Sequence, residues 1–449
     1  MFEGIHYVHF VGIGGIGMSA LAKWFLLSGI KVSGSDVHES DLTRDLARRG
    51  AQVYSGHAPG QVAQDVDLLI YTPAAPESNV ERQAARERGI RMCSNFEFLG
   101  ELSRAFSTIV VSGTNGKSTT TAMLGLILEA AGYDPTVLVG SLVPSFKDGN
   151  LRLGKGRFFV VEGCEYRANM LHLEPEMIVL TNVEEDHLDY YRDLAHIQAT
   201  FQQFVDKLKG KGVVVLNADD AVSKNLEVNG SVQYGSYGTN GTYALLQRRV
   251  EYGEQTVSTS HGELRLRVPG AFNAMNALGA MAAAMELGVP FETCRRALFD
   301  FTGIWRRFER VGSWHGAEVI SDYGHHPTAI TATIEAAREF FPGRRVVLCY
   351  QPHQHDRTKK LFNEFVQALS HADALVLAEI YDVAGRNEDA EVSSHDLSEA
   401  MKKDDPSKDV RFAKDLRAAE AALRDLVESG DVLLIMGAGD IDEVARKLV

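Results

Sequence analysis

The sequence predicts an α/β fold of about three domains built on parallel sheets. Three observations lead to this prediction. Predicted strands alternate with predicted helices along most of the chain, which is the pattern of parallel sheets with helical connections. The length of 449 residues corresponds to about three domains of average size. Two glycine-rich segments each follow a strand and open a helix, a position typical of phosphate-binding loops.

The first half of the chain supplies two strand–loop–helix units. The first has a strand over residues 6–11 and a helix over 18–28, followed by strands over 31–35 and 68–71. The second has a β-rich run over 108–112 and a helix over 118–131. Further strands are predicted over 158–161, 177–180 and 213–216. We place the first domain boundary near residue 106.

The second half begins with a different pattern. Residues 234–268 are rich in Gly, Ser, Thr and Tyr, which predicts antiparallel strands or irregular excursions. An Ala/Met-rich helix is predicted over about 273–286, and strands over 318–321, 346–350, 375–379 and 432–436. With a second boundary near residue 312, the predicted domains are 1–106, 107–312 and 313–449.

Composition excludes several classes of protein. Hydrophobic residues make up 45% of the chain, enough for each domain to bury a core, and the net charge of −14 argues against a non-specific nucleic-acid binder. No apolar run reaches the roughly 18 residues of a membrane span, and no signal peptide is visible, so we expect a cytoplasmic protein. The four cysteines form no C-x-x-C pair and are expected to be free thiols.

The first glycine loop is Gly12-Ile13-Gly14-Gly15-Ile16-Gly17, which fits G-x-G-x-x-G. Its glycines would let the backbone approach a pyrophosphate at the helix N-terminus. Asp36 lies 19 residues after Gly17 and suits a ribose hydroxyl. The loop alone is typical of a dinucleotide-binding dehydrogenase, and a tight turn without a ligand is the alternative.

The second glycine loop is Gly113-Thr114-Asn115-Gly116-Lys117-Ser118-Thr119. Its amides would cradle phosphates, Lys117 would reach the terminal ones and Ser118 could ligate Mg²⁺. The full P-loop pattern fails, because Val111 stands where the first glycine belongs. Two phosphate loops indicate two phosphorylated ligands, which a simple dehydrogenase does not need.

Acidic residues and a histidine follow the next predicted strands. Glu162 comes at the end of the strand over 158–161, where ligands gather in open α/β sheets, so it could hold Mg²⁺ near a γ-phosphate. A loop carboxylate in water is the alternative. His187 lies in Asp186-His187-Leu188-Asp189, and a metal or phosphate role and a structural role stay equally open.

Taken together, these motifs resemble the Mur ligase family. The resemblance rests on the second glycine loop, on Glu162 and on Thr-Asn-x-x-x-Asp-His-Leu-Asp over residues 181–189. Motifs over residues 303–309, 322–328, 351–353 and 437–440 are most similar to the branch of the family that adds L-alanine. The similarity covers nearly the whole chain.

The resemblance implies an architecture and an activity. An N-terminal Rossmann-like domain would hold UDP-N-acetylmuramate, a central P-loop-type mononucleotide-binding α/β domain ATP and Mg²⁺, and a C-terminal Rossmann-like domain the amino acid. The implied activity is ATP-dependent ligation of L-alanine through an acyl phosphate, in peptidoglycan precursor synthesis. A monomer or homodimer is expected, with no nucleic-acid or membrane partner.

The resemblance also assigns roles by position. Catalytic roles fall on Lys117, Glu162 and His187, and metal ligation on Ser118, Glu162 and His187. ATP contacts fall on Gly113, Thr114, Asn115, Gly116, Lys117, Ser118, Thr119, Asn276, Arg307 and Asp322. UDP-sugar contacts fall on Gly14, Gly15, Ile16, Gly17, Ser35, Asp36 and Thr72, and amino-acid contacts on His325, His353 and Arg357, whose cation suits an α-carboxylate.

The chain departs from the family pattern at Gln354, which replaces an arginine common in the amino-acid loop. The first lysine after His187 is Lys207, farther along than the modified lysine of several sibling ligases, and the alanine-adding branch likewise lacks that lysine. Three alternatives remain at this level: the sibling ligase that attaches a recycled tripeptide to UDP-N-acetylmuramate, an NAD-dependent dehydrogenase, and a non-catalytic nucleotide sensor.

Overall fold

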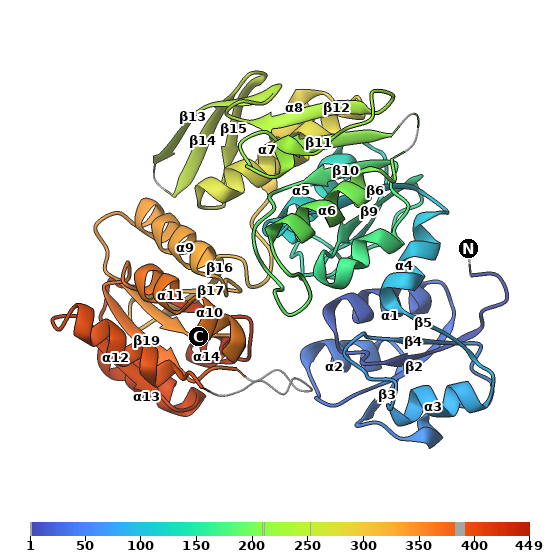
Figure 1. The fold of residues 1–449 in the computed structure, drawn as a ribbon, viewed down its shortest axis with the longest axis horizontal. Helices are drawn as coiled ribbons and strands as arrows, with labels where there is room; N and C mark the ends of the chain where they lie inside the picture. The colour runs from blue at the N-terminus through green and yellow to red at the C-terminus, as the bar shows by residue number, and fades with distance from the viewer. Residues whose placement is uncertain (1, 209, 211, 252, 382–390) are drawn as a thin grey trace. The chain divides into compact units, whose positions relative to one another are not determined.

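The computed structural model describes residues 2–208, 210, 212–251, 253–381 and 391–449. Its strands form three sheets (Figure 1). Contacts divide the chain into two compact units. Unit 1 comprises Met1–Gln247, Ser258–Leu264 and Met275–Phe299, and unit 2 comprises Arg248–Val257, Arg265–Ala274 and Asp300–Val449. Among the described residues, no helix combines the length and the apolarity that crossing a membrane requires.

The first sheet has five parallel strands in the order β3-β2-β1-β4-β5. Its strands are β1 (Tyr7–Val11), β2 (Lys31–Asp36), β3 (Gln52–Ser55), β4 (Leu68–Tyr71) and β5 (Arg91–Ser94). The connecting helices are α1 (Ile16–Leu27), α2 (Asp41–Arg48), η1 (Pro59–Gln61), α3 (Val80–Glu87) and α4 (Asn95–Ser103). The strand order reverses between β1 and β4, which is the switch point where such sheets bind ligands.

The second sheet has ten strands in the order β15-β14-β13-β12-β11-β10-β6-β9-β7-β8. They are β6 (Ser107–Ser112), β7 (Thr136–Leu138), β8 (Leu151–Arg152), β9 (Phe158–Gly163), β10 (Met177–Leu180), β11 (Val213–Asn217), β12 (Gln233–Gly238), β13 (Tyr243–Glu251), β14 (Glu254–Thr259) and β15 (Gly262–Leu266). The helices are α5 (Lys117–Ala130), η2 (Tyr166–His172), α6 (Leu194–Val205), η3 (Ser223–Asn225), α7 (Ala271–Glu286) and α8 (Phe291–Asp300).

Within unit 1, a single hydrophobic cluster joins the first sheet to the second. Trp24 of α1 is almost fully buried, and its ring lies 5.5 Å from that of Phe159 on β9 and 6.0 Å from that of Phe106. The same cluster contains Phe10 of β1 and Val110 of β6. Because α1 begins directly after the first glycine loop, this packing places that loop beside the central sheet.

The third sheet belongs to unit 2 and has the order β16-β17-β21-β18-β19-β20. Its strands are β16 (Glu309–Trp314), β17 (Ala317–Asp322), β18 (Val346–Tyr350), β19 (Ala374–Ala378), β20 (Asp409–Ala413) and β21 (Val432–Met436). One face packs against α9 (Pro327–Phe340), α11 (Phe362–Leu369) and α12 (Ser394–Asp404), and the other against α13 (Leu416–Leu426) and α14 (Asp442–Leu448). The short α10 (His355–Lys360) follows β18.

The structure confirms the α/β class and most predicted strands, and it corrects others. The predicted strands over 346–350 and 432–436 coincide with β18 and β21. The region 234–268, predicted to hold antiparallel strands or irregular excursions, contains strands β12 to β15, and β13 pairs with β12 in parallel. The sequence pattern did not predict the short strands β3, β5, β7 and β8, nor strands β16 and β20. The boundary proposed near residue 312 falls inside β16.

Candidate functional site

The first glycine loop follows β1 at the switch point of the first sheet. Gly14 N–H donates to Asp36 Oδ2 at 2.8 Å, so the carboxylate at the end of β2 fastens the loop. A Cβ on Gly14 would lie 2.9 Å from both Asp36 Oδ2 and Thr43 Cγ2. Packing within the protein therefore requires glycine at position 14.

Gly15 and Gly17 are glycines for a different reason. A Cβ on Gly15 would meet no neighbouring atom closer than 3.5 Å, and one on Gly17 none closer than 3.9 Å. The protein itself leaves room at both positions. Gly15 precedes α1, whose N-terminus has no side-chain cap, so its first amides can bind an anion. This open cradle fits a diphosphate.

Two other predicted contacts of the UDP-sugar flank this loop. Thr72 follows β4, and its N–H donates to Val11 O at 3.0 Å. The Ser35 hydroxyl is buried, donating to Glu81 Oε2 at 2.5 Å and lying 2.8 Å from His57 Nδ1. The Ser35 hydroxyl is thus bound to protein side chains and not directed at a ligand site. The sequence reading missed Glu81 and His57, because neither belongs to a motif.

The second glycine loop connects β6 to α5 and is shaped by its neighbours. Gly116 has φ +83° and caps α5, and a Cβ there would lie 2.3 Å from Asn276 Oδ1. Asn276 is on α7 and accepts from the Thr120 hydroxyl at 3.3 Å. The structure therefore brings this predicted ATP contact against the loop.

The segment after β10 holds the second loop from the other side. Asn115 N–H donates to Asn182 Oδ1 at 2.8 Å, and Thr114 N–H donates to Asn182 O at 2.8 Å. Thr181 Oγ1 donates to Asn115 O at 2.5 Å. These bonds fix the backbone of the loop before any ligand binds. The free-energy cost of ordering the loop on binding is therefore reduced.

Lys117 begins α5 and turns back over its own loop. Its Nζ donates to Gly113 O at 2.6 Å and to Thr114 O at 3.0 Å, and pairs with Glu165 Oε2 at 2.8 Å. Burial alone would lower the pKa of Lys117, but the charge of Glu165, its hydrogen bond to Lys117 and the nearby Cys164 and Glu162 together outweigh burial, and the pKa is raised. Lys117 is therefore a cation at the mouth of the loop.

Glu165 is a candidate site residue that the sequence motifs did not assign. Its side chain is only 6% exposed and lies between two predicted catalytic residues, Lys117 and His187, whose Nε2 is 3.4 Å from Glu165 Oε1. Burial tends to raise the pKa of Glu165, yet Lys117 and His187 outweigh burial and hold it below its usual range. His187 has φ +55°, a strained conformation for this residue, and its ring packs on Tyr166.

Glu162 and Ser118 form the oxygen-rich part of the site. Ser118 Oγ donates to Glu162 Oε2 at 3.0 Å, and Gly140 N–H donates to Glu162 Oε1 at 2.5 Å. Among the residues that the structure describes, no three His, Cys, Asp or Glu side chains cluster as a metal site. Mg²⁺ is commonly held by one or two carboxylates together with substrate phosphates, so this pair fits it. The third proposed metal ligand, His187, faces Glu165 and Asp186, and its ring packs on Tyr166.

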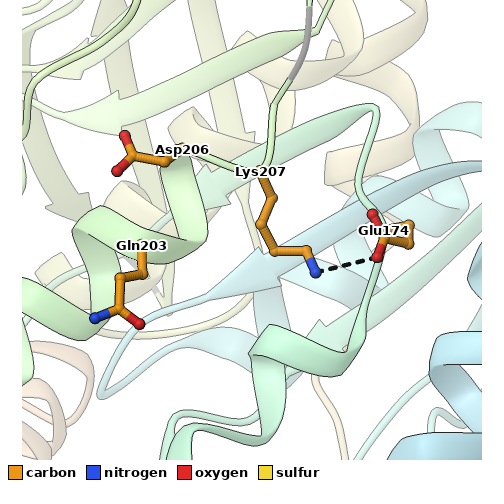
Figure 2. Close-up of a pocket in the computed structure, with 4 residues that line it drawn as sticks. All are labelled: Glu174, Gln203, Asp206 and Lys207. Atoms are coloured by element: carbon orange, nitrogen blue, oxygen red, sulfur yellow. Dashed lines mark hydrogen bonds and ion pairs between the residues drawn. The ribbon is translucent and has the colours of Figure 1, made fainter.

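A separate pocket on the central domain lies near η2 and the end of α6. Figure 2 shows its lining by Glu174, Gln203, Asp206 and Lys207, with Lys207 paired to Glu174 at 3.2 Å. Lys207 Nζ also donates to Leu171 O at 2.8 Å. The cation is thus already satisfied, and none of these residues belongs to either glycine loop.

Unit 2 gathers the C-terminal candidates at the carboxyl ends of its strands. Asp322 ends β17 and accepts from Phe308 N–H and Gly324 N–H, both at 2.7 Å. Burial raises its pKa, although the neighbouring Arg307 opposes this. The Arg307 guanidinium lies 4.9 Å from the ring centre of Tyr323. The two predicted nucleotide contacts of this unit, Arg307 and Asp322, are therefore neighbours.

The predicted amino-acid contacts also come together. The rings of His325 and His353 lie 6.1 Å apart, and Arg357 Nη1 donates to His353 O at 3.3 Å. Tyr381 stacks on His353 with ring centres 5.7 Å apart, and its N–H donates to Pro352 O. Tyr381 was not predicted, since it follows β19 and belongs to no motif.

Comparison with known proteins matches all three regions of the chain. Residues 7–107 match the Mur ligase family catalytic domain, residues 111–284 the Mur ligase middle domain, and residues 306–439 the Mur ligase glutamate ligase domain. A UDP-N-acetylmuramate–L-alanine ligase of Clostridium novyi is 41% identical, with 98% of this chain and 96% of that protein covered. One of Lachnospira eligens is 39% identical, with 99% and 98% covered.

Solved structures show the same fold. The UDP-N-acetylmuramate–alanine ligase of Thermotoga maritima is similar with a TM-score of 0.86, at 30% identity and 98% coverage of both chains. A murein peptide ligase of Psychrobacter arcticus is similar in fold with a TM-score of 0.74, at 24% identity, covering 99% of this chain and 98% of that one.

Proposed function

The chain belongs to the Mur ligase family, and we propose that it joins L-alanine to UDP-N-acetylmuramate with consumption of ATP. The observation that carries this proposal is the presence of two glycine loops suited to phosphates, after β1 and after β6, in one compact unit. One loop offers an open diphosphate cradle and the other a cation and a metal-binding pair. The relatives named for this activity span the whole chain.

The reaction requires an activated carboxyl group. A carboxylate oxygen of the muramate attacks the γ-phosphorus of ATP, the bond to the bridging oxygen breaks, and ADP leaves. The amine of L-alanine then attacks the acyl carbon, the carbon–oxygen bond to phosphate breaks, and the amine loses a proton. This order is needed because a free carboxylate is a poor acyl donor, whereas phosphate is a good leaving group.

Lys117 supplies the main electrostatic stabilisation in this scheme. Its Nζ lies at the loop mouth, held by Gly113 O and Thr114 O, and rotation of the side chain would bring it to the terminal phosphates. There the cation would stabilise the charge that spreads over the transferring phosphoryl oxygens. Glu165 pairs with Lys117 and favours its charged form, and His187 contacts the other oxygen of the same carboxylate.

Ser118 and Glu162 are proposed to hold Mg²⁺. When bound, the ion would neutralise charge on the nucleotide phosphates. Glu162 is oriented for this by Gly140 N–H, which fixes one carboxylate oxygen while the other faces Ser118. His187 remains a proposed ligand by family position.

The three proposed regions divide the substrates between them. Residues 1–106 would bind the UDP-sugar through Gly14, Gly15, Ile16 and Gly17, residues 107–312 ATP, and residues 313–449 L-alanine through His325, His353 and Arg357. The family argues against the dehydrogenase alternative. We further propose a cytoplasmic location and a monomeric or homodimeric state, in keeping with cytosolic nucleotide substrates.

The test is phosphate release from ATP in the presence of UDP-N-acetylmuramate and a set of acceptors. L-alanine, glycine, L-serine and the tripeptide are compared by kcat/KM under identical conditions. We expect L-alanine to be preferred, with glycine and L-serine weaker by about 10- to 200-fold, since one methyl or hydroxyl group is worth only about 1–3 kcal/mol. Preference for the tripeptide would assign the chain to the recycling ligase instead.

A further inference from the structure

One connection in unit 1 contacts the first glycine loop and the Glu162 carboxylate that binds the second. Residues 139–150, called here the bridging segment, join β7 to β8. The segment is closed on itself by Val139 N–H, which donates to Asn150 O at 3.0 Å, and by Val143 N–H, which donates to Gly149 O at 3.1 Å. Its two ends are therefore held together.

One end of the bridging segment binds the first glycine loop. Asn150 is fully buried, and its Nδ2 donates to Ile16 O at 2.6 Å and to Ser19 Oγ at 2.9 Å. Ile16 is the residue between Gly15 and Gly17 of the open cradle. A buried amide thus ties the backbone beside this cradle to the bridging segment, while the loop itself is held by Asp36.

Lys23 secures the same end from α1. Its Nζ is almost fully buried, donates to Asp148 O at 2.9 Å and Asn150 Oδ1 at 3.0 Å, and lies 3.2 Å from Asp45 Oδ2. Burial lowers the pKa of Lys23, and Asp45 opposes this effect. The three partners match the three N–H donors of the ammonium group, so Lys23 is bound on all sides by protein groups.

The other end of the bridging segment is linked to the second loop through Glu162. Gly140 N–H donates to Glu162 Oε1 at 2.5 Å, and Ser118 of the second loop donates to Glu162 Oε2 at 3.0 Å. A path of hydrogen bonds and covalent links therefore runs from Ile16 through Asn150, Val139, Gly140 and Glu162 to Ser118. The apolar contact around Trp24 holds the surfaces together, and these directional polar bonds add to the packing that fixes their register.

We propose that Asn150 and Lys23 are positioning residues that hold the two glycine loops in register, so that the muramate carboxylate meets the γ-phosphate of ATP. This inference rests on the proposed function, since it assumes that both phosphorylated substrates react with each other. A displacement of about 1 Å at a reacting centre can lower a rate by about a hundredfold. The residues touch neither reacting group and act through Ile16 and Glu162.

The test compares binding of each substrate alone with turnover of both. Asn150→Asp keeps the side-chain size and the acceptor for Lys23 but removes the donor to Ile16 O, and Lys23→Met removes the ammonium group while keeping most of the chain volume. Lys147→Met is the matched control, because Lys147 is an exposed lysine in the same segment.

We expect Asn150→Asp and Lys23→Met to lower kcat by about tenfold or more, within the range given by misplacement of reactants. Dissociation constants for UDP-N-acetylmuramate alone and for ATP alone should change by less than about twofold, since each loop stays intact. Lys147→Met should match the wild type in all three measurements.

Two results would overturn the proposal. One is wild-type kcat in both variants. The other is weakened binding of each lone substrate with unchanged kcat, which would mean that the contacts serve only folding. Should either variant fail to fold, Asn150→Ser, which removes the amide with less change in charge, is measured in the same way. Failure of the wild-type protein to release phosphate with any acceptor would refute the proposed function instead.

Discussion

Replacing Lys117 by alanine should separate the stability of the site from its chemistry. Lys117 is paired with a buried Glu165, and breaking such a pair by removing one partner costs about 3–5 kcal/mol. His187 still faces the carboxylate, so we expect the lower end of that range. Loss of the cation should also reduce kcat at least about a hundredfold, which corresponds to about 2.7 kcal/mol of transition-state stabilisation.

The two effects are told apart by adding Glu165→Gln to Lys117→Ala. The neutral glutamine removes the unpaired buried charge, so the free energy of unfolding measured in urea should recover by about 1–3 kcal/mol relative to Lys117→Ala, the cost of an unsatisfied buried group. Phosphate release should not recover. Lys155→Ala, at an exposed lysine of the same domain, is the control for both assays.

Binding of UDP-N-acetylmuramate by itself should remain close to that of the wild type, since the first glycine loop is separate from Lys117. Turnover near the wild-type rate in a folded Lys117→Ala protein would refute the assignment of the second loop. Recovery of turnover in the double variant would show that the defect came from the unpaired Glu165 and not from the missing cation.

Three further predictions concern the other parts of the site. Gly15→Val should weaken UDP-sugar binding and spare ATP binding in calorimetry, whereas Gly60→Val, at an open position of the same domain, should change neither; equal loss of both ligands would contradict the cradle. Arg357→Ala should raise the KM of the amino acid far more than that of ATP, and equal effects would mean that Arg357 does not anchor the carboxylate. Because the pKa of Glu165 is lowered, its stabilising contribution is present above the unfolded value near pH 4.3 and is lost as the pH falls through the lower folded value. The free energy of unfolding in urea should therefore fall more between pH 7 and pH 3 in the wild type than in Glu165→Gln. Identical decreases would show that the Lys117–Glu165 pair does not contribute to the pH dependence of stability.

The sequence was sufficient where a local pattern and its physical cause lie close together. The glycine loops between β1 and α1 and between β6 and α5 were placed correctly, because glycine, strand and helix signals are contiguous there. Buried strands such as β18 and β21 stood out as continuous apolar runs. The confirmed family resemblance assigned both Gly116 and Asn276 to ATP, and the structure brings these two residues together although they are 160 residues apart in the chain.

Other features could not be read from the chain because their partners are distant. Glu165 lies three residues after Glu162, but only the fold shows that it meets both Lys117 and His187. Strands β7 and β8 have three and two residues, too few for a periodic signal, and the bridging segment between them has no motif. Ser35 was assigned to a ligand by position, whereas its hydroxyl is directed at Glu81.

The burial of Trp24 gives the enzyme an intrinsic optical probe. The chain has three tryptophans, and the other two, Trp305 and Trp314, belong to unit 2. In a protein carrying Trp305→Phe and Trp314→Phe, the fluorescence would come from an indole packed against Phe159 and Phe106, where the first sheet meets the second. A red shift of its emission would then report solvent entering this contact, so separation of the two glycine loops could be followed in real time without an attached label.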